Sequence, residues 1–315
     1  PYSTPCTTVN KVCGSSMKAA MIAASAIRAG EYEVVISGGM ESMSNSPHFA
    51  KKIGRDKYEE MQSILLHDGL WDAYNDEHMG NTGEQVAEEF GISREEADAF
   101  ASRSHRLANH AWDAGWMEWE AFPIEGTDPE GEEIIVTRDE GIRSDNDADD
   151  LAGLDPVFRQ DGMVTAGNSS QISDGAAAIL LASRERAEKE GWPILARIVD
   201  QTTSGVEPER VMAAPMPAVE TLLERNGLGP DDISFFEHNE AFASASCAVA
   251  KTLGISDEKL NPHGGAVAIG HPLGATGARI LMALINALQR NGGGKGIATI
   301  CLGGGNAVAM LVEVD

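Results

Sequence analysis

Apolar residues at helical spacing follow Cys13 and predict the first helix of the chain. Its apolar face is formed by Met17, Ala20, Met21, Ala24 and Ile27, and Gly30 marks its end. A short apolar run over residues 33–37 comes next and is closed by Gly38 and Gly39. Such a run is typical of a buried strand. Helix followed by central strand is half of a β-α-β unit.

The last part of the chain repeats this alternation and therefore predicts an α/β fold with a buried sheet. The helix at Gly14, its strand and Gly38-Gly39 resemble the helix near Gly274, its strand and residues 303–305, which indicates two related halves. The expected helices cover residues 184–191, about 216–226, about 240–254 and about 274–290, and the expected strands cover 175–181, 196–200, 234–237, 296–301 and 306–314.

Residues from about Met40 to Gly167 have a different texture, being polar and rich in loops. A capping box, Ser93 to Glu96, predicts a helix that runs to about Ala114. Residues 125–155 contain twelve acidic residues and two arginines, a composition that indicates an exposed excursion.

Composition excludes several function classes. The net charge is −25, from 49 acidic and 24 basic residues, so nucleic acids and anionic membranes are not expected partners. An acidic surface with few lysines also suits a high-salt cytoplasm, where screening relieves self-repulsion. The chain has no run of 18 apolar residues, so no transmembrane helix is expected, and its first residues lack the basic and apolar regions of a signal peptide. Four cysteines without Cys-x-x-Cys spacing favour the cytoplasm over a disulfide scaffold or a zinc site.

Three polar residues lie where α/β enzymes place their chemistry. Cys13 precedes a helix N-terminus, which favours the thiolate, although a small buried thiol is an equally good interpretation. His271 lies among glycines before a helix, and Cys301 ends a strand before three glycines. Two thiols, an imidazole and free backbone amides suit acyl transfer through a thioester, with N–H groups holding the oxyanion.

Four stretches, in this order, resemble the signature segments of the thiolase family. Residues 9–16 read Val-Asn-Lys-Val-Cys-Gly-Ser-Ser, residues 239–242 Asn-Glu-Ala-Phe, residues 270–279 Gly-His-Pro-Leu-Gly-Ala-Thr-Gly-Ala-Arg, and residues 301–305 Cys-Leu-Gly-Gly-Gly. The resemblance covers essentially the whole chain. It implies the layered α-β-α-β-α fold of two related halves with an inserted loop domain, and the match is close to the family's acetyl-CoA acetyltransferases and 3-ketoacyl-CoA thiolases.

The resemblance also implies roles for single residues in a reversible Claisen condensation of two acetyl-CoA molecules. Cys13 would be the nucleophile that carries the acyl group, His271 would activate it, and Cys301 would be the acid and base. His271 and a water held by Asn239 would form one oxyanion hole, and the N–H groups of Cys13 and Gly303 the other. No metal and no tightly bound cofactor are implied, since coenzyme A and acyl-CoA are substrates.

Further positions match the family's coenzyme A site. Six residues would line the pantetheine and thioester path: His78, Met79, Ala166, Ser170, Ala241 and Phe242. Arg143 would lie beside the adenine end, and an arginine in an acidic excursion suits an anionic ligand. His238 and His263 match no catalytic position and are interpreted as structural.

The resemblance divides the chain into three parts. Residues 1–41 and 172–195 would form the N-terminal half, residues 42–171 the loop domain over coenzyme A, and residues 196–315 the C-terminal half. Family members carry several dozen residues before the Cys13 segment, so the N-terminal half is expected to be incomplete at its start, with exposed strand edges. A homodimer or homotetramer is expected.

Three alternatives remain open at this point. The first is a degradative 3-ketoacyl-CoA thiolase of fatty-acid β-oxidation, because the sequence does not define the size of the acyl pocket. The second is a ketosynthase of the same superfamily, against which Cys301 argues. The third is an inactive fragment or binding subunit that keeps the motifs.

Overall fold

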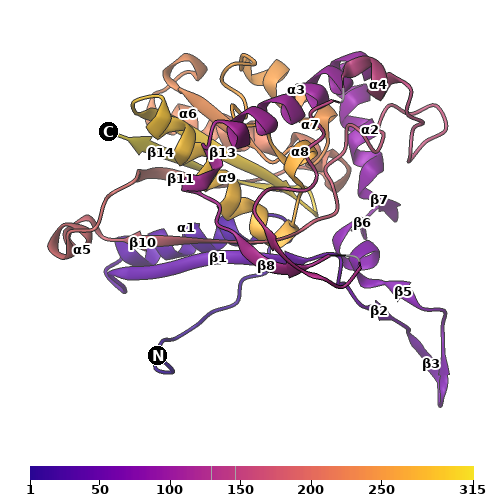
Figure 1. The fold of residues 1–315 in the computed structure, drawn as a ribbon, viewed down its shortest axis with the longest axis horizontal. Coiled ribbons are helices and arrows are strands. Elements are labelled where there is room, and N and C mark those ends of the chain that lie inside the picture. Colours follow the sequence, from indigo (N-terminus) through magenta and orange to yellow (C-terminus); the bar gives the residue numbers. More distant parts are fainter. Residues whose placement is uncertain (129, 146) are drawn as a thin grey trace.

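The computed structural model describes residues 1–128, 130–145 and 147–315. The helices and sheets of the chain are stacked in layers (Figure 1). A four-stranded sheet lies at the centre, with the order β11-β14-β13-β12. β12 is parallel to β13, whereas β14 is antiparallel to both β13 and β11. These strands are β11 (Arg197–Gly205), β12 (Phe235–His238), β13 (Gly294–Leu302) and β14 (Asn306–Val314).

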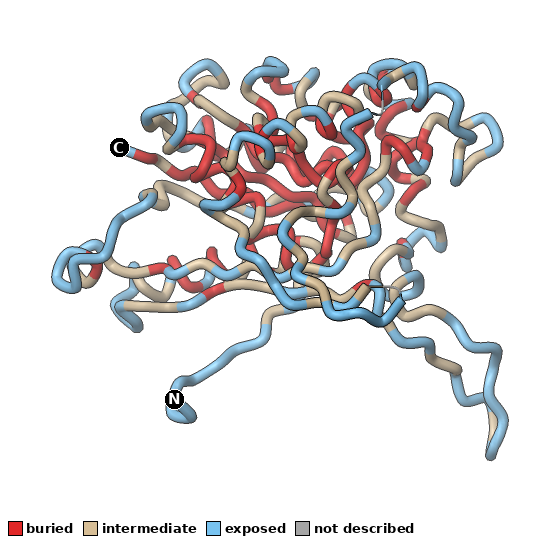
Figure 2. Tube along the Cα trace, viewed as in Figure 1, coloured by how far each residue is buried: buried red, intermediate tan, exposed pale blue. Residues whose placement is uncertain are grey.

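Helices cover both faces of this sheet, and β13 and β14 are therefore buried along almost their whole length (Figure 2). On one face, α6 (Pro215–Asn226) packs on β14 and β11, with α7 (Ala243–Leu253) beside it. On the other face lies α9 (Leu273–Arg290), which packs against α1 (Ser15–Arg28). Two apolar clusters result, one on each side of the sheet.

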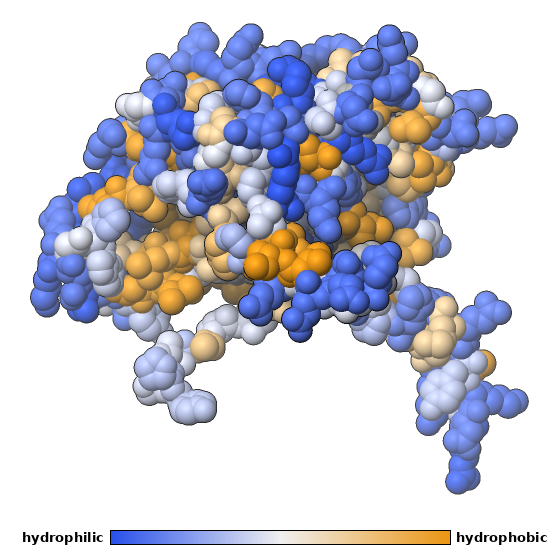
Figure 3. Space-filling view, viewed as in Figure 1, coloured by the Kyte–Doolittle hydropathy of each residue, from blue (hydrophilic) through white to orange (hydrophobic). Residues whose placement is uncertain are grey.

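A second, two-stranded sheet lies beyond α1 and α9 (Figure 1). It pairs β1 (Val34–Ser42) with β10 (Asp174–Ala182) in antiparallel register. α1 and α9 cover its inner face, whereas its outer face exposes Ile36 (76%), Met40 (74%) and Leu180 (53%). Figure 3 shows apolar residues on the surface near this two-stranded sheet. The order helix, strand, antiparallel strand thus occurs twice, in α1-β1-β10 and in α9-β13-β14.

The polar middle of the chain forms a separate set of short elements beside the sheets. Its longest helix, α3 (Arg94–Asp113), begins after Ser93 with the predicted capping box. Residues 129 and 146 of the acidic excursion are outside the described residues. The other elements of this part are β2 (His48–Phe49), β3 (Lys52–Gly54), β4 (Lys57–Tyr58), β5 (Gln62–Ser63), a π-helical turn (Leu65–Gly69), β6 (Trp71–Asp72), β7 (Glu77–His78), α2 (Met79–Phe90), a 3₁₀ turn (Met117–Trp119), β8 (Ile124–Thr127), β9 (Glu133–Val136) and α4 (Ala148–Ala152).

The predicted helices and strands of the layered part are confirmed, with one clear error at β1. The glycine pair Gly38-Gly39 does not close the strand, which continues to Ser42. A Cβ at Gly39 would collide with the backbone oxygen of Gly274, so glycine is needed there for the close approach of α9. The remaining elements are α5 (Arg184–Glu190), α8 (Ala266–Ile269) and 3₁₀ turns at Pro208–Ala213 and Pro230–Asp232. Among the described helices, none is long and apolar enough to cross a membrane.

Candidate active site

A narrow cavity of about 60 Å³ brings the two cysteines and the histidine of the sequence motifs together. Its walls come from the turn before α1, the start of α2, the segments before α7 and α9, and the end of β13. The lining residues that the sequence predicted are Cys13, Met79, Ser170, Ala241, Phe242, His271, Cys301 and Gly303, and those that it did not predict are Gly69, Leu70, Val211, Met212, Leu273 and Leu302.

Cys13 is held by a tight, strained turn. Val12, directly before it, has φ 48°, a left-handed conformation that is rare for a β-branched residue. The Ser15 hydroxyl donates to the Val12 carbonyl at 2.7 Å, and the Val12 N–H donates to Asn10 Oδ1 at 3.1 Å. Gly14 allows the backbone to pass against Leu302, where a Cβ would collide. The turn therefore fixes the Cys13 thiol against the end of β13.

The expectation of a thiolate at Cys13 is wrong for the resting protein. Burial raises the pKa of the Cys13 thiol well above its ordinary value, and the nearby Cys301 raises it further. The backbone N–H groups of Cys13 and Gly303 act in the opposite direction and favour a negative charge at this point. Cys13 also precedes α1 by two residues, which weakens the effect of the helix dipole. The resting thiol therefore needs a base.

The imidazole of His271 lines the same cavity and is only 5% exposed. Its Nδ1 lies 2.7 Å from the hydroxyl of Thr276, and its Nε2 has no partner within the described residues. Burial, with smaller contributions from Arg279 and His238, lowers the pKa of His271 to about 3. The ring is therefore neutral at physiological pH and can accept a proton.

Cys301 has a different set of partners. Its thiol donates to Asn239 Oδ1 at 3.4 Å, and its backbone N–H donates to the same oxygen at 3.2 Å. Met212 Sδ lies 3.7 Å from Cys301 Sγ. Burial raises the pKa of the Cys301 thiol to about 11. The Asn239 Nδ2 group is buried and has no partner within the described residues, so it is free to donate to a water or a ligand.

Buried hydrogen bonds hold the segments that carry these groups. Glu240, with φ 50°, accepts from the Ser104 hydroxyl at 2.7 Å, from Asn261 Nδ2 at 2.6 Å and from the Val267 N–H at 3.1 Å. The carboxylate thus ties the turn after Asn239 to α3 and to the segment before His271.

Gln171 and Ser170 hold the other side of the cavity. The Gln171 side-chain amide donates to the carbonyls of Gly141, Val267 and Ala268, and the Gln171 backbone carbonyl accepts from the His271 N–H at 3.1 Å. The Ser170 N–H donates to the Ala241 carbonyl at 3.0 Å. These contacts join the middle region directly to the segments that contain Ala241 and His271.

Three residues of the predicted coenzyme A path lie outside this narrow cavity. His78 is the N-cap of α2, where its Nδ1 accepts from the Gly80 N–H at 2.9 Å, and its ring stacks on Phe158 at 4.7 Å. Phe158 in turn contacts the ring of Phe242, a cavity residue. Arg143 and Ala166 are exposed, and the Arg143 N–H donates to His105 Nδ1 at 3.1 Å.

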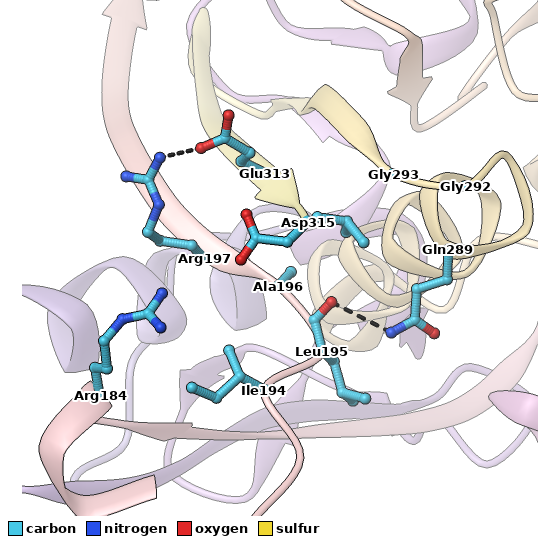
Figure 4. A pocket seen from close by; sticks show the side chains of 11 residues that line it. Arg184, Ile194, Leu195, Ala196, Arg197, Gln289, Gly292, Gly293, Glu313 and Asp315 are labelled. Carbon is cyan, nitrogen blue, oxygen red and sulfur yellow. Dashed lines mark hydrogen bonds and ion pairs between the residues drawn. The ribbon is translucent and has the colours of Figure 1, made fainter. Parts of the chain in front are cut away.

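A second cavity, of about 250 Å³, lies where the start of β11 meets the end of β14 (Figure 4). Arg184 and Arg197 point toward it, but so does Asp315, and Arg197 is already paired with Glu313. Cys13, Cys301 and His271 are absent from its lining. The described residues contain no group of three or more His, Cys, Asp and Glu side chains that could hold a metal ion. The narrow cavity is therefore the candidate active site.

Comparisons with known proteins agree with this geometry. Residues 1–185 match the family model described as "Thiolase, N-terminal domain", and residues 192–314 match "Thiolase, C-terminal domain". The chain is 45% identical over 317 residues to the acetyl-CoA acetyltransferase of Chromobacterium violaceum, covering 99% of this chain and 81% of that protein. It is also 45% identical over 319 residues to acetyl-CoA acetyltransferase 2 of Arabidopsis thaliana, covering 100% of this chain and 79% of that protein.

Solved structures give the same result. Human mitochondrial 3-ketoacyl-CoA thiolase superposes with a TM-score of 0.95 at 36% identity, over 100% of this chain and 80% of that one. The Acat5 thiolase of Ascaris suum, solved in complex with coenzyme A, superposes with a TM-score of 0.92 at 38% identity, over 100% of this chain and 81% of that one. Family models that together span nearly the whole chain, and relatives at this identity, show that the chain belongs to the thiolase family.

Proposed function

We propose that this chain is an acetyl-CoA C-acetyltransferase, which condenses two acetyl-CoA molecules to acetoacetyl-CoA and coenzyme A and also catalyses the reverse thiolysis. The observation that carries the proposal is a single cavity that contains two thiols with different surroundings and one neutral imidazole. The curated relatives named acetyl-CoA acetyltransferase at 42–45% identity support the same activity.

In the first half-reaction, Cys13 takes the acetyl group. His271 Nε2 accepts the Cys13 proton, and the thiolate attacks the thioester carbonyl of the first acetyl-CoA. The N–H groups of Cys13 and Gly303, which already favour negative charge at this sulfur, hold the oxyanion. The tetrahedral intermediate collapses, and the leaving coenzyme A thiolate takes the proton of Cys301. This leaves acetyl-Cys13, an imidazolium at His271 and a thiolate at Cys301.

In the second half-reaction, the Cys301 thiolate removes a proton from the methyl group of the second acetyl-CoA. The imidazolium Nε2–H and a water held by Asn239 Nδ2 stabilise the enolate oxygen. The enolate carbon attacks acetyl-Cys13, and the departing Cys13 thiolate recovers its proton from His271. Every group returns to its starting protonation state. Thiolysis is the same sequence in reverse.

A thiolase with longer 3-ketoacyl substrates is the second candidate, because the human mitochondrial 3-ketoacyl-CoA thiolase superposes closely on this chain. Met212 Sδ lies 3.7 Å from Cys301 Sγ and occupies space beside the acid and base thiol, which supports a preference for the acetyl group.

The finer assignments are also proposals. Residues 42–171 would form the lid over coenzyme A between a first half of residues 1–41 and 172–195 and a second half of 196–315, since Met79 and Ser170 line the cavity from this region. Arg143, His78 and Ala166 would contact the nucleotide and pantetheine. The enzyme would act in the cytoplasm as a homodimer or homotetramer, and its acidic composition would suit high salt.

The test is the thiolysis of acetoacetyl-CoA by coenzyme A, followed by the loss of enolate absorbance, in low and in molar KCl. Cys13→Ala serves as the control for the acyl-enzyme, and longer 3-ketoacyl-CoA substrates are measured beside acetoacetyl-CoA. Faster turnover of acetoacetyl-CoA supports the acetyltransferase. Faster turnover of long chains favours the second candidate, and a folded protein without either activity overturns both.

A further inference from the structure

The His271 ring has one hydrogen-bonded nitrogen and one free nitrogen. Nδ1 lies 2.7 Å from Thr276 Oγ1, whereas Nε2, on the other side of the ring, has no partner in the part of the chain that the structure describes. Both side chains are buried, with Thr276 at 0% exposed. The contact therefore cannot be exchanged for one with bulk water, and its direction decides which nitrogen carries the proton.

Thr276 has a second contact that fixes this direction. Its hydroxyl donates to the carbonyl oxygen of Pro272, one turn earlier, at 2.9 Å. A hydroxyl has a single proton, so an oxygen that donates to Pro272 can only accept from the imidazole. Nδ1 then carries the proton, and Nε2 presents a lone pair to the cavity that contains Cys13 and Cys301.

We propose that Thr276 is a positioning residue that holds His271 in the Nδ1–H tautomer and so leaves Nε2 ready to accept the Cys13 proton. The inference rests on the proposed acyl transfer for its kinetic consequence, but the tautomer itself is a property of the resting protein. When Nε2 becomes protonated, the Nδ1–H bond to Thr276 is retained, because the threonine oxygen accepts in both states. The ring therefore need not rotate between its role as base and its role as donor to the enolate.

The chain contains a matched control for this contact. His238 Nδ1 lies 2.8 Å from Ser246 Oγ, and both residues are fully buried. Burial also lowers the pKa of His238, to about 4. His238 does not line the cavity and contributes only a little to the lowered pKa of His271, so the loss of its hydroxyl partner reports mainly what a buried histidine–hydroxyl bond is worth for stability.

The experiment compares Thr276→Val, Thr276→Ser and Ser246→Ala in the whole chain. Valine keeps the shape of threonine and removes the hydroxyl, whereas serine keeps the hydroxyl.

The first readout is the rate at which acetyl-CoA acetylates Cys13, followed by mass spectrometry under single-turnover conditions. We expect Thr276→Val to slow acetylation about 10-fold to 100-fold, the range known for loss of the partner that orients a metal-bound histidine, with little change in the acetyl-CoA concentration that gives half the maximal rate. Thr276→Ser should restore most of the rate, and Ser246→Ala should leave it unchanged.

The second readout is the ¹⁵N chemical shift of the two ring nitrogens, assigned to His271 with the His271→Gln variant. We expect the Nδ1–H tautomer in the wild-type chain and a mixture with Nε2–H in Thr276→Val. An Nε2–H tautomer in the wild type overturns the inference, and so does wild-type acetylation by a folded Thr276→Val. If the wild type does not acetylate Cys13 at all, the proposed function fails, whereas the shifts still decide the tautomer.

Discussion

The two thiols of the cavity differ in what surrounds them. Cys301 donates to Asn239 Oδ1, whereas the Cys13 sulfur is close to the backbone N–H groups of Cys13 and Gly303. Backbone amides stabilise an oxyanion that forms on a group bound to Cys13, and they offer nothing to a proton on carbon. These surroundings support the proposed roles of Cys13 as the acyl carrier and Cys301 as the acid and base.

Cys301→Ala tests this separation. We expect Cys13 still to become acetylated, because His271 can return its proton to the leaving thiolate. Condensation should fall by at least about 10²-fold, since the general base is lost. Mass spectrometry of the acyl-enzyme and the formation of acetoacetyl-CoA are measured together. Cys247→Ala, which changes a thiol outside the cavity, is the control, and full condensation activity in Cys301→Ala would break the assignment.

The raised pKa of Cys13 makes its reactivity depend on His271. The raised pKa of the half-buried Cys13 thiol favours its protonated form at pH 7.5, so alkylation by iodoacetamide requires transfer of its proton to the imidazole. We expect His271→Ala to slow alkylation of Cys13 by at least about 10-fold, while the exposed Cys6 reacts at an unchanged rate. Peptide mass spectrometry measures both sites in one sample. Equal Cys13 labelling with and without His271 would show that the thiolate forms without this base.

The sequence motifs predicted the reactive groups of the site but only part of its walls. Cys13, His271 and Cys301 lie in short stretches whose glycines and local order are visible along the chain. Leu70 and Met212 are ordinary apolar residues in their own segments, and only long-range packing brings them to the cavity. The pKa of Cys13 was also misjudged for this reason, because burial depends on segments distant in sequence and outweighs the local helix dipole.

At the scale of elements, the site depends on how closely α1 and α9 cross. A Cβ at Gly277 of α9 would lie 2.6 Å from the Met17 nitrogen and 2.7 Å from the Met17 Cβ of α1. The Ala278 N–H also donates to the Ser16 hydroxyl at 2.9 Å. Because Cys13 precedes α1 and His271 precedes α9, this crossing sets the position of the Cys13 thiol relative to the His271 imidazole.

Gly277→Ala should therefore affect stability and chemistry together. We expect a loss of about 1–3 kcal/mol in the free energy of unfolding, as overpacking usually gives, and slower acetylation of Cys13, measured by urea unfolding and single turnover. Gly205→Ala is the control, because a Cβ there meets no atom within 4 Å and its φ is not positive. A Gly277→Ala protein as stable and as fast as the wild type would show that the helices can separate freely.

Elements were predictable where the periodic pattern was long, as in α3 with its capping box and in α9. The pattern failed at Gly38-Gly39, where glycine serves a helix contact rather than a turn. It also gave no prediction for α2 or for the two-residue pairs β2 with β5 and β6 with β7, which are too short to show a period.

The whole molecule carries a net charge of −25, and its surface must repel itself at low salt. We expect the melting temperature to rise by several degrees between low and molar KCl, because salt screens exposed charges within about 10 Å at 0.1 M and about 3 Å at 1 M. Differential scanning fluorimetry measures the shift, and equal ionic strength from NaCl separates screening from a specific effect of potassium. A melting temperature that stays constant with salt would contradict the high-salt interpretation.

The outer face of the β1–β10 sheet gives the last prediction. Ile36 and Leu180 lie directly opposite each other in the register, and with Met40 they form an apolar patch on a sheet whose other face is already covered by α1 and α9. Patches of this kind bind apolar dyes and promote aggregation. We expect the chain to enhance the fluorescence of anilinonaphthalene sulfonate and to scatter light as its concentration rises.

The double variant Ile36→Lys and Leu180→Glu should reduce both signals, because the two new charges face each other across the strands and need no burial. Ile53→Lys is the control, since Ile53 is 59% exposed in the separate β3–β4 pair. Equal dye binding in the double variant and the wild type would mean that the dye reports another surface. A drop confined to the double variant would show that the dye binds this patch of the β1–β10 sheet.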